Sequence, residues 1–151
     1  MTLIEKDFDE ILDYAHMWNW APDWVVVRDV YRRFPESYSV LTPFAYTYLE
    51  EMIRTTTPEY GMPLYDRSGI PVSVKRGSAL IELAIKENKE NTEYVELLQQ
   101  MKSYYKPTPG DPTTNNRNQV LHGHLHPRFW SKENFELLIH DIAKLSKFSK
   151  F

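Results

Sequence analysis

The stretch from Asn115 to Arg128 concentrates side chains that could do acid–base and anion-binding chemistry. It holds three of the five histidines, and no Asp or Glu occurs between Pro112 and Lys132, although the chain has 21 acidic residues. Cations without neighbouring carboxylates give a locally positive field, and a helix start would add its backbone N–H groups. The composition of this stretch therefore predicts a site for an anion such as a phosphate.

Arg117 and His122 are the residue types that metal-free RNA cleavage needs. An imidazole with an ordinary pKa of about 6.5 can take a proton from a ribose hydroxyl at neutral pH. A guanidinium can hold the scissile phosphate and stabilise the charge that develops on it, giving a cyclic phosphate product. The two residues lie about 140° apart on a helix, so Arg117 would reach around it or meet the histidine of a second subunit. Asn118 precedes His122 by four residues and would share its face.

The run Asn116-Arg117-Asn118-Gln119-Val120-Leu121-His122-Gly123 resembles the signature of the HEPN superfamily (higher eukaryotes and prokaryotes nucleotide-binding domains). That signature is an Arg, a polar residue directly after it and a His four to six residues beyond the Arg. The likeness covers about thirty-five residues, Asn115 to Leu145. It implies an all-α bundle and, in many members, a dimeric ribonuclease of toxin–antitoxin, abortive-infection or antiviral systems.

The resemblance also implies roles for individual residues. His122 would be the catalytic histidine, Arg117 the phosphate-facing arginine and Asn118 its polar support. His124, Arg128 and Lys132 are the expected additional contacts to RNA. The predicted function is thus a metal-independent, cofactor-free endoribonuclease in the cytoplasm, with RNA, a second copy of the chain and an antitoxin protein as partners and with no DNA or membrane partner.

Two other functions are compatible with the same residues. Arg117 could pair with a carboxylate of a neighbouring helix and His122 could cap or pack, in which case neither has a functional role. The second functional hypothesis is a helical module that uses the same surface to bind a protein, a nucleotide or RNA without turnover. His122, His124 and His126 alternate, a spacing that binds zinc on an extended backbone, and this gives a metal-binding regulator as the third hypothesis. On a helix only His122 and His126 share a face, and no carboxylate or Cys is near, so no native metal site is expected.

Length and composition exclude several classes of protein. A chain of 151 residues is expected to form one domain, and without Cys it has no disulfides, thiolate metal sites or cysteine nucleophile. The longest apolar runs are far too short to span a membrane, and early charges in the N-terminal residues argue against a secretory leader. A net charge of −3 excludes a broad basic surface but permits a local one.

The elements that must position these residues are predicted to be six or seven helices in a single all-α domain, residues 1–151. Pro22 is expected in a first helical turn, and Thr42-Pro43, Thr92 and Ser131 are expected to start helices. Apolar side chains recur at helical spacing along residues 4–18, 22–34, 42–54, 78–88, 92–105, 115–125 and 131–148.

Residues 58–77 interrupt this pattern with three Pro and three Gly. They predict a short extended insert in which two strands flank a turn at Ser68-Gly69. His16 and His140 are expected at interior or boundary positions, outside any reacting centre. Core packing is the expected role of the early aromatic residues, Trp18, Trp20, Trp24, Tyr31, Phe34 and Tyr38.

Overall fold

Six α-helices and two short 3-10 helices make up the regular structure of residues 1–105 and 131–151, the parts of the chain that the computed structural model describes. These residues form no β-strand, so the all-α prediction is confirmed for them. The predicted helix at 115–125 lies outside the described residues. The elements are α1 (Leu3–Tyr14), α2 (Ala21–Arg33), η1 (Pro35–Ser37), α3 (Tyr38–Arg54), α4 (Gly77–Glu87), α5 (Thr92–Met101), η2 (Lys102–Tyr105) and α7 (Lys132–Ser146).

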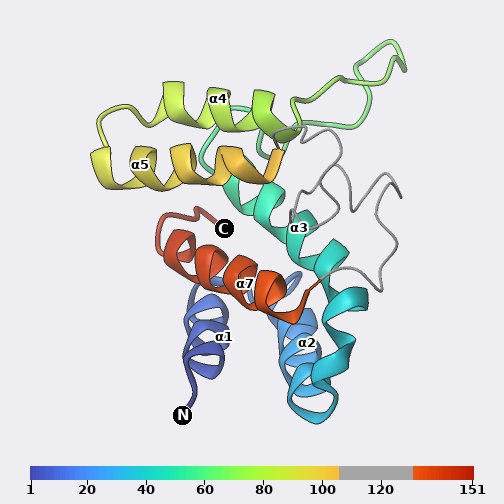
Figure 1. The fold of residues 1–151 in the computed structure, drawn as a ribbon. Helices are drawn as coiled ribbons and strands as arrows, with labels where there is room; N and C mark the ends of the chain where they lie inside the picture. The colour runs from blue at the N-terminus through green and yellow to red at the C-terminus, as the bar shows by residue number, and fades with distance from the viewer. Residues whose placement is uncertain (106–130) are drawn as a thin grey trace, which may run out of the picture.

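The helices form two groups that α3 and α7 connect (Figure 1). α1 and α2 pack against each other at one end of the molecule, and α4 and α5 form an antiparallel hairpin at the other. α3 runs from the first group to the second, while α7 packs on α1, α3 and α5. α7 therefore contacts both groups, and it begins directly after the segment that carries the predicted motif.

The apolar stripe of α7 is the best predicted part of the core. Phe135, Leu138, Ile139, Ile142 and Leu145 are all buried, as their helical spacing indicates. Ser131 caps the helix as predicted, because its hydroxyl accepts a hydrogen bond from the backbone N–H of Asn134 at 3.0 Å. The first residue of α7, Lys132, thus has a fixed backbone position.

Trp24 and Tyr48 form the centre of an aromatic cluster with edge-to-face geometry. Their ring centroids lie 5.0 Å apart, and the rings of Trp20 and Phe44 pack against them. The core prediction is wrong for two other aromatic residues, since Trp18 is 80% and Phe34 67% exposed. α1 ends at Tyr14, which leaves Trp18 in the turn before α2, and Phe34 follows the last residue of α2.

The predicted ends of α2 agree with the structure, but the predicted start of α3 is wrong. α2 has Pro22 in its first turn and ends at Arg33, before Pro35. α3 begins at Tyr38, because the 3-10 helix η1 leads the chain directly into it, and Pro43 lies within the helix. The Thr42 hydroxyl donates to the Tyr38 carbonyl at 2.7 Å instead of capping a helix start.

Three consecutive threonines end α3 at the predicted place. The hydroxyls of Thr55, Thr56 and Thr57 donate to the carbonyls three residues earlier at 2.6, 2.8 and 2.9 Å. The Asn88 side chain at the end of α4 donates to the Thr56 carbonyl at 3.0 Å, and the Lys150 backbone N–H donates to the Thr55 hydroxyl at 2.9 Å. This end of α3 is therefore hydrogen-bonded both to the end of α4 and to the C-terminal residues.

The insert between α3 and α4 is extended, as predicted, but it contains a single antiparallel bridge between Tyr65 and Pro71 in place of two strands. Asp66 explains the difference. Its Oδ1 accepts hydrogen bonds from the backbone N–H groups of Ser68 at 2.8 Å and Ile70 at 3.0 Å, and Pro71 has no N–H to donate to a ladder. Figure 1 shows the insert projecting from the helices.

The cap of α5 is Asn91 and not Thr92, so this prediction is also wrong. The Asn91 Oδ1 accepts the backbone N–H of Tyr94 at 3.2 Å, and Thr92 is the first helical residue. Its position one residue earlier lets the Asn91 carboxamide reach an amide of the first turn.

Replacing the two residues separately tests this assignment. We expect Asn91→Ala to lower the free energy of unfolding by about 1 kcal/mol, because it removes the cap. The matched Thr92→Ala change is expected to stay within about 0.5 kcal/mol of the wild type, because it touches no cap. Urea unfolding followed by circular dichroism measures both variants. Equal losses in the free energy of unfolding would show that Asn91 is not the cap.

Candidate functional site

Most of the predicted catalytic and RNA-binding residues lie outside the described residues. These are Arg117, Asn118, His122, His124 and Arg128, together with His126 of the metal hypothesis. Lys132 is described, and it lies in the first turn of α7. Lys132 and the groove that it lines therefore form the candidate site.

The chain is fixed to the helices on both sides of residues 106–130. Before them, Tyr104 and Tyr105 of η2 are buried, and the Tyr104 hydroxyl donates to Asp141 Oδ2 of α7 at 2.6 Å. After them, the Ser131 cap starts α7. The residues directly before and after 106–130 are thus held in place by contacts with the helices.

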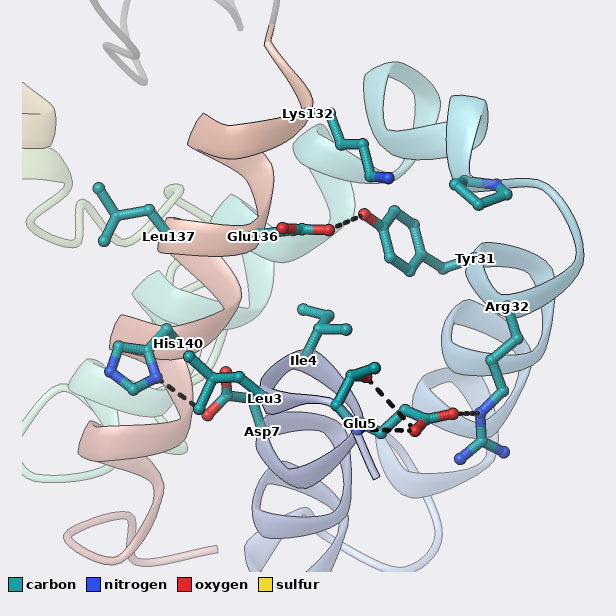
Figure 2. Close-up of a pocket in the computed structure, with 12 residues that line it drawn as sticks. Leu3, Ile4, Glu5, Asp7, Tyr31, Arg32, Lys132, Glu136, Leu137 and His140 are labelled. Carbon is teal, nitrogen blue, oxygen red and sulfur yellow. Dashed lines mark hydrogen bonds and ion pairs between the residues drawn. The ribbon is translucent and has the colours of Figure 1, made fainter.

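Lys132 contributes to an open groove between α1, α2 and α7, with a volume of about 820 Å³ (Figure 2). Both apolar and charged side chains line it. Its α7 side carries Lys132, Glu136 and His140 at intervals of four residues, which places them on one face of that helix. The other lining residues are Thr2, Leu3, Ile4, Glu5, Asp7, Tyr31, Arg32, Pro35 and Leu137.

Asp7 and His140 form an ion pair at one end of the groove. The distance between Asp7 Oδ1 and His140 Nδ1 is 3.0 Å. The Asp7 side chain is 10% exposed and that of His140 30% exposed, so the carboxylate lies behind the ring and the ring reaches solvent. A carboxylate on Nδ1 orients an imidazole and favours the proton on that nitrogen.

Glu5 and Arg32 pair across the groove from His140. The distance between Arg32 Nε and Glu5 Oε1 is 3.4 Å. The other Glu5 oxygen accepts the Thr2 backbone N–H at 3.1 Å in a capping box at the start of α1. The Thr2 N–H, assisted by the positive charge of Arg32, lowers the pKa of the Glu5 carboxyl. Glu5 is thus held as a carboxylate that already has its partners.

Tyr31 and Glu136 form the third pair in the groove. The Tyr31 hydroxyl donates to Glu136 Oε1 at 2.5 Å. Burial raises the pKa of the Tyr31 hydroxyl, and the hydrogen bond to Glu136 raises it further. At neutral pH Tyr31 is therefore a neutral donor that occupies one oxygen of Glu136.

Each carboxylate of the groove is engaged, whereas one of its cations has no ion-pair partner among the described residues. Glu5, Asp7 and Glu136 are bonded to Arg32, His140 and Tyr31, respectively. Within residues 1–105 and 131–151 no carboxylate forms an ion pair with Lys132. Figure 2 shows the Lys132 side chain extending over the groove. The groove therefore carries Lys132 at the start of α7 and the Asp7–His140 pair two turns further along the same helix.

The described residues contain no group of three His, Asp or Glu side chains that could hold a metal ion. The three histidines of the metal hypothesis lie outside these residues. No helix in the described ranges is long and apolar enough to cross a membrane.

No protein-family model, curated protein or solved structure matches this chain. Its function must therefore be inferred from its own residues.

Sequence reasoning missed the Asp7–His140 pair. It placed His140 correctly at a boundary position but did not connect it with an acidic residue 133 positions away. Asp7 is one of several acidic residues in α1, and its neighbours in sequence do not mark it as buried. Only the packing of α1 against α7 selects it.

Proposed function

We propose that this chain is a metal-independent endoribonuclease that resembles HEPN enzymes. The observation that carries the proposal is Arg117-Asn118-x3-His122 in a stretch without carboxylates. Two further features support it. The described residues form an all-α fold, and Lys132, at the start of the next helix, lines a groove.

In this mechanism His122 removes the proton from the ribose 2′ hydroxyl. The 2′ oxygen attacks the neighbouring phosphorus, the bond from phosphorus to the 5′ oxygen breaks, and a 2′,3′-cyclic phosphate forms. The 5′ oxygen takes a proton from water and leaves as a hydroxyl. Arg117 holds the phosphate and stabilises its additional negative charge, and Asn118 supports the pair. DNA is not a substrate because it has no 2′ hydroxyl.

The proposal includes the setting of the reaction. His124, Arg128 and Lys132 contact the RNA backbone. Two copies of the chain form a dimer that brings two motifs together, and an antitoxin protein restrains the activity in the cytoplasm. A toxin–antitoxin or antiviral role follows from the resemblance of the motif.

Cleavage of labelled RNA in EDTA tests the proposal. We expect Arg117→Ala and His122→Ala to lower the cleavage rate by about 10²–10⁴-fold, because each removes one part of the reacting pair. His16→Ala is the matched control, since this histidine contacts Phe151 far from the motif in sequence. DNA of the same sequence should remain intact. Cleavage at one rate by all variants, or none by the wild type, would contradict the proposal.

An RNA-binding module without turnover is the second candidate. Lys132 favours it, because this lysine forms no ion pair with the described residues and a lysine can bind phosphate without reacting. This candidate predicts saturable RNA binding that weakens with salt and with Arg117→Ala, and no product. Fluorescence anisotropy with a labelled RNA, followed by electrophoresis of the same sample, separates the two candidates.

A further inference from the structure

We propose that a second copy of this chain packs against the insert between α3 and α4, so that the insert of each copy covers the turn between α1 and α2 of the other. The insert is residues 58–77, and the turn is residues 15–20. The inference gives an interface to the dimer that the proposed function includes, and in this respect it rests on that proposal. Association is measured without RNA, so the two proposals can fail separately.

The insert exposes large apolar side chains that the helices do not cover. Leu64 is 82% exposed, and Tyr65 and Ile70 are each more than half exposed. Figure 1 shows the insert projecting from the helices. Between residues 60 and 74 it contains two Tyr, one Met and one Arg but no Lys or Glu. Aromatic residues, Met and Arg are enriched in protein interfaces and Lys and Glu are depleted, so this composition favours a contact surface.

The turn between α1 and α2 exposes a second set of large apolar side chains. Trp18 is 80% and Met17 71% exposed. Trp20, two residues after Trp18, lines an open cavity of about 630 Å³ together with Tyr60 and Leu64 of the insert. The turn and the insert therefore meet at this cavity, which leaves room for side chains of a second copy. Exposed apolar surface of this kind is typical of interaction sites.

Hydrogen bonds hold the insert in its shape. Arg54 Nη2 of α3 donates to the Lys75 carbonyl at 2.8 Å, and the Lys75 backbone N–H donates to Glu59 Oε2 at 2.8 Å. At the tip, Asp66 accepts two backbone N–H groups of the turn. A preformed surface loses less conformational entropy on association than a flexible one. The insert is thus arranged before a partner arrives.

The charges that the insert offers to a partner are positive. Its two carboxylates, Glu59 and Asp66, accept hydrogen bonds from backbone N–H groups of the insert itself. Arg67 and Arg76 are exposed, and within residues 1–105 and 131–151 neither forms an ion pair. The insert therefore presents two arginines beside its apolar side chains.

The charges around the turn are negative. The sequence has no Lys or Arg from Asp7 to Val27. Asp13 lies in the last turn of α1 and Asp23 in the first turn of α2, and both are exposed. Neither forms an ion pair with any residue that the structure describes. The turn therefore presents carboxylates beside Trp18.

This division of charge selects a second copy as the partner. In a two-fold symmetric dimer one contact occurs twice, so the surface must be complementary to itself. A face with arginines at the insert and aspartates at the turn meets this condition. The carboxylates of the turn would repel RNA, and the arginines of the insert would repel a basic protein.

Sedimentation equilibrium of the purified full chain without RNA tests the interface. We expect a dimer, and we expect Trp18→Ala and Leu64→Ala each to raise its dissociation constant at least about 30-fold, because each change removes an apolar contact at both symmetric sites. Leu3→Ala is the matched control, since Leu3 is 64% exposed at the start of α1 and should not affect association. Circular dichroism confirms that these surface variants fold.

A mixing experiment assigns the two sides of the contact. Arg67→Glu places a carboxylate opposite the acidic turn, and Asp13→Lys with Asp23→Lys places cations opposite the arginines. Each variant alone should associate at least about 10-fold more weakly than the wild type. In a mixture, one contact joins an unchanged insert to an unchanged turn, and the other joins the two reversed sides. We therefore expect a heterodimer with nearly wild-type affinity. Arg33→Glu, at the end of α2, is the charge control and should associate normally.

Each outcome decides the inference. Weaker dimers for the single variants and recovery in the mixture support it. A wild-type chain that stays monomeric, or a dimer that Trp18→Ala and Leu64→Ala leave unchanged, would overturn it. Charge variants that stay weak when mixed would also overturn it, because the insert would not meet the turn. RNA cleavage is measured on the same samples. A dimer that cleaves no RNA would overturn the proposed function alone, and a monomer that cleaves RNA would overturn this inference alone.

Discussion

The free energy of unfolding is expected to fall steeply above pH 10. The reason is a set of buried tyrosines. Burial raises the pKa of Tyr94 to about 12 and raises the pKa of the Tyr48 hydroxyl further. Burial also raises the pKa of Tyr104, and the carboxylate of Asp141 beside it adds to this effect. All three side chains are almost inaccessible to solvent.

The direction of this pH dependence follows from the difference in tyrosine pKa between the unfolded and the folded state. In the unfolded chain these tyrosines ionise at about pH 10, whereas in the folded protein they remain neutral. Their contribution to stability is complete below that pH and is lost as the pH rises towards the folded pKa. Each group costs about 1.4 kcal/mol per pH unit in this window, so three groups cost about 8 kcal/mol over two units. Typical domains have a total stability of about 5–15 kcal/mol.

Urea unfolding at intervals from pH 8 to pH 12 measures this slope. Tyr94→Phe should make it shallower by about 1.4 kcal/mol per pH unit, because one group no longer titrates. Tyr65→Phe, a matched change in the exposed insert, should leave the slope unchanged. Stability that stays constant up to pH 12 would contradict the burial of these hydroxyls.

Leu138→Ala is expected to destabilise the protein by about 2–5 kcal/mol. Leu138 is fully buried in the face of α7 that belongs to the core. Truncation removes the transfer free energy of the lost methyl groups and leaves a cavity that neighbouring helices cannot fill completely. Because α7 packs on α1, α3 and α5, the substitution should lower the free energy of global unfolding and not only the local order of α7.

Leu137 provides a control of the same chemistry on the same helix. Its side chain is 53% exposed and lines the groove, so Leu137→Ala should change the free energy of unfolding by no more than about 0.5 kcal/mol. Denaturant unfolding of both variants gives the comparison. Similar losses for the two changes would mean that α7 does not present the face described above to the core.

Periodicity predicted the helices well where one face is apolar and the other charged. The stripe of α7 and the ends of α2 are examples, because burial of one face and the chemistry of Pro and Ser act locally. The start of α3 was not predictable in this way. Thr42-Pro43 has the chemistry of a helix start, but η1 starts the helix earlier, and tertiary packing tolerates a proline in the interior.

The candidate groove was less predictable than the fold. Lys132 could be nominated from its neighbours in the sequence, whereas Asp7 and His140 are joined only by the packing of two distant helices. Trp18 is an error of the opposite kind. Its spacing continues the apolar stripe of α1 and predicted burial, but α1 ends before it and its side chain is exposed. Pairwise packing of helices is not encoded in the pattern of any one segment.

The end of α3 makes the two groups of helices a single cooperative unit. Opening the α4–α5 hairpin would separate Asn88 from the Thr56 carbonyl, and release of the C-terminal residues would separate Lys150 from Thr55. Each buried polar group left without a partner costs about 1–3 kcal/mol. Relative rotation of the two groups of helices is therefore resisted at this junction.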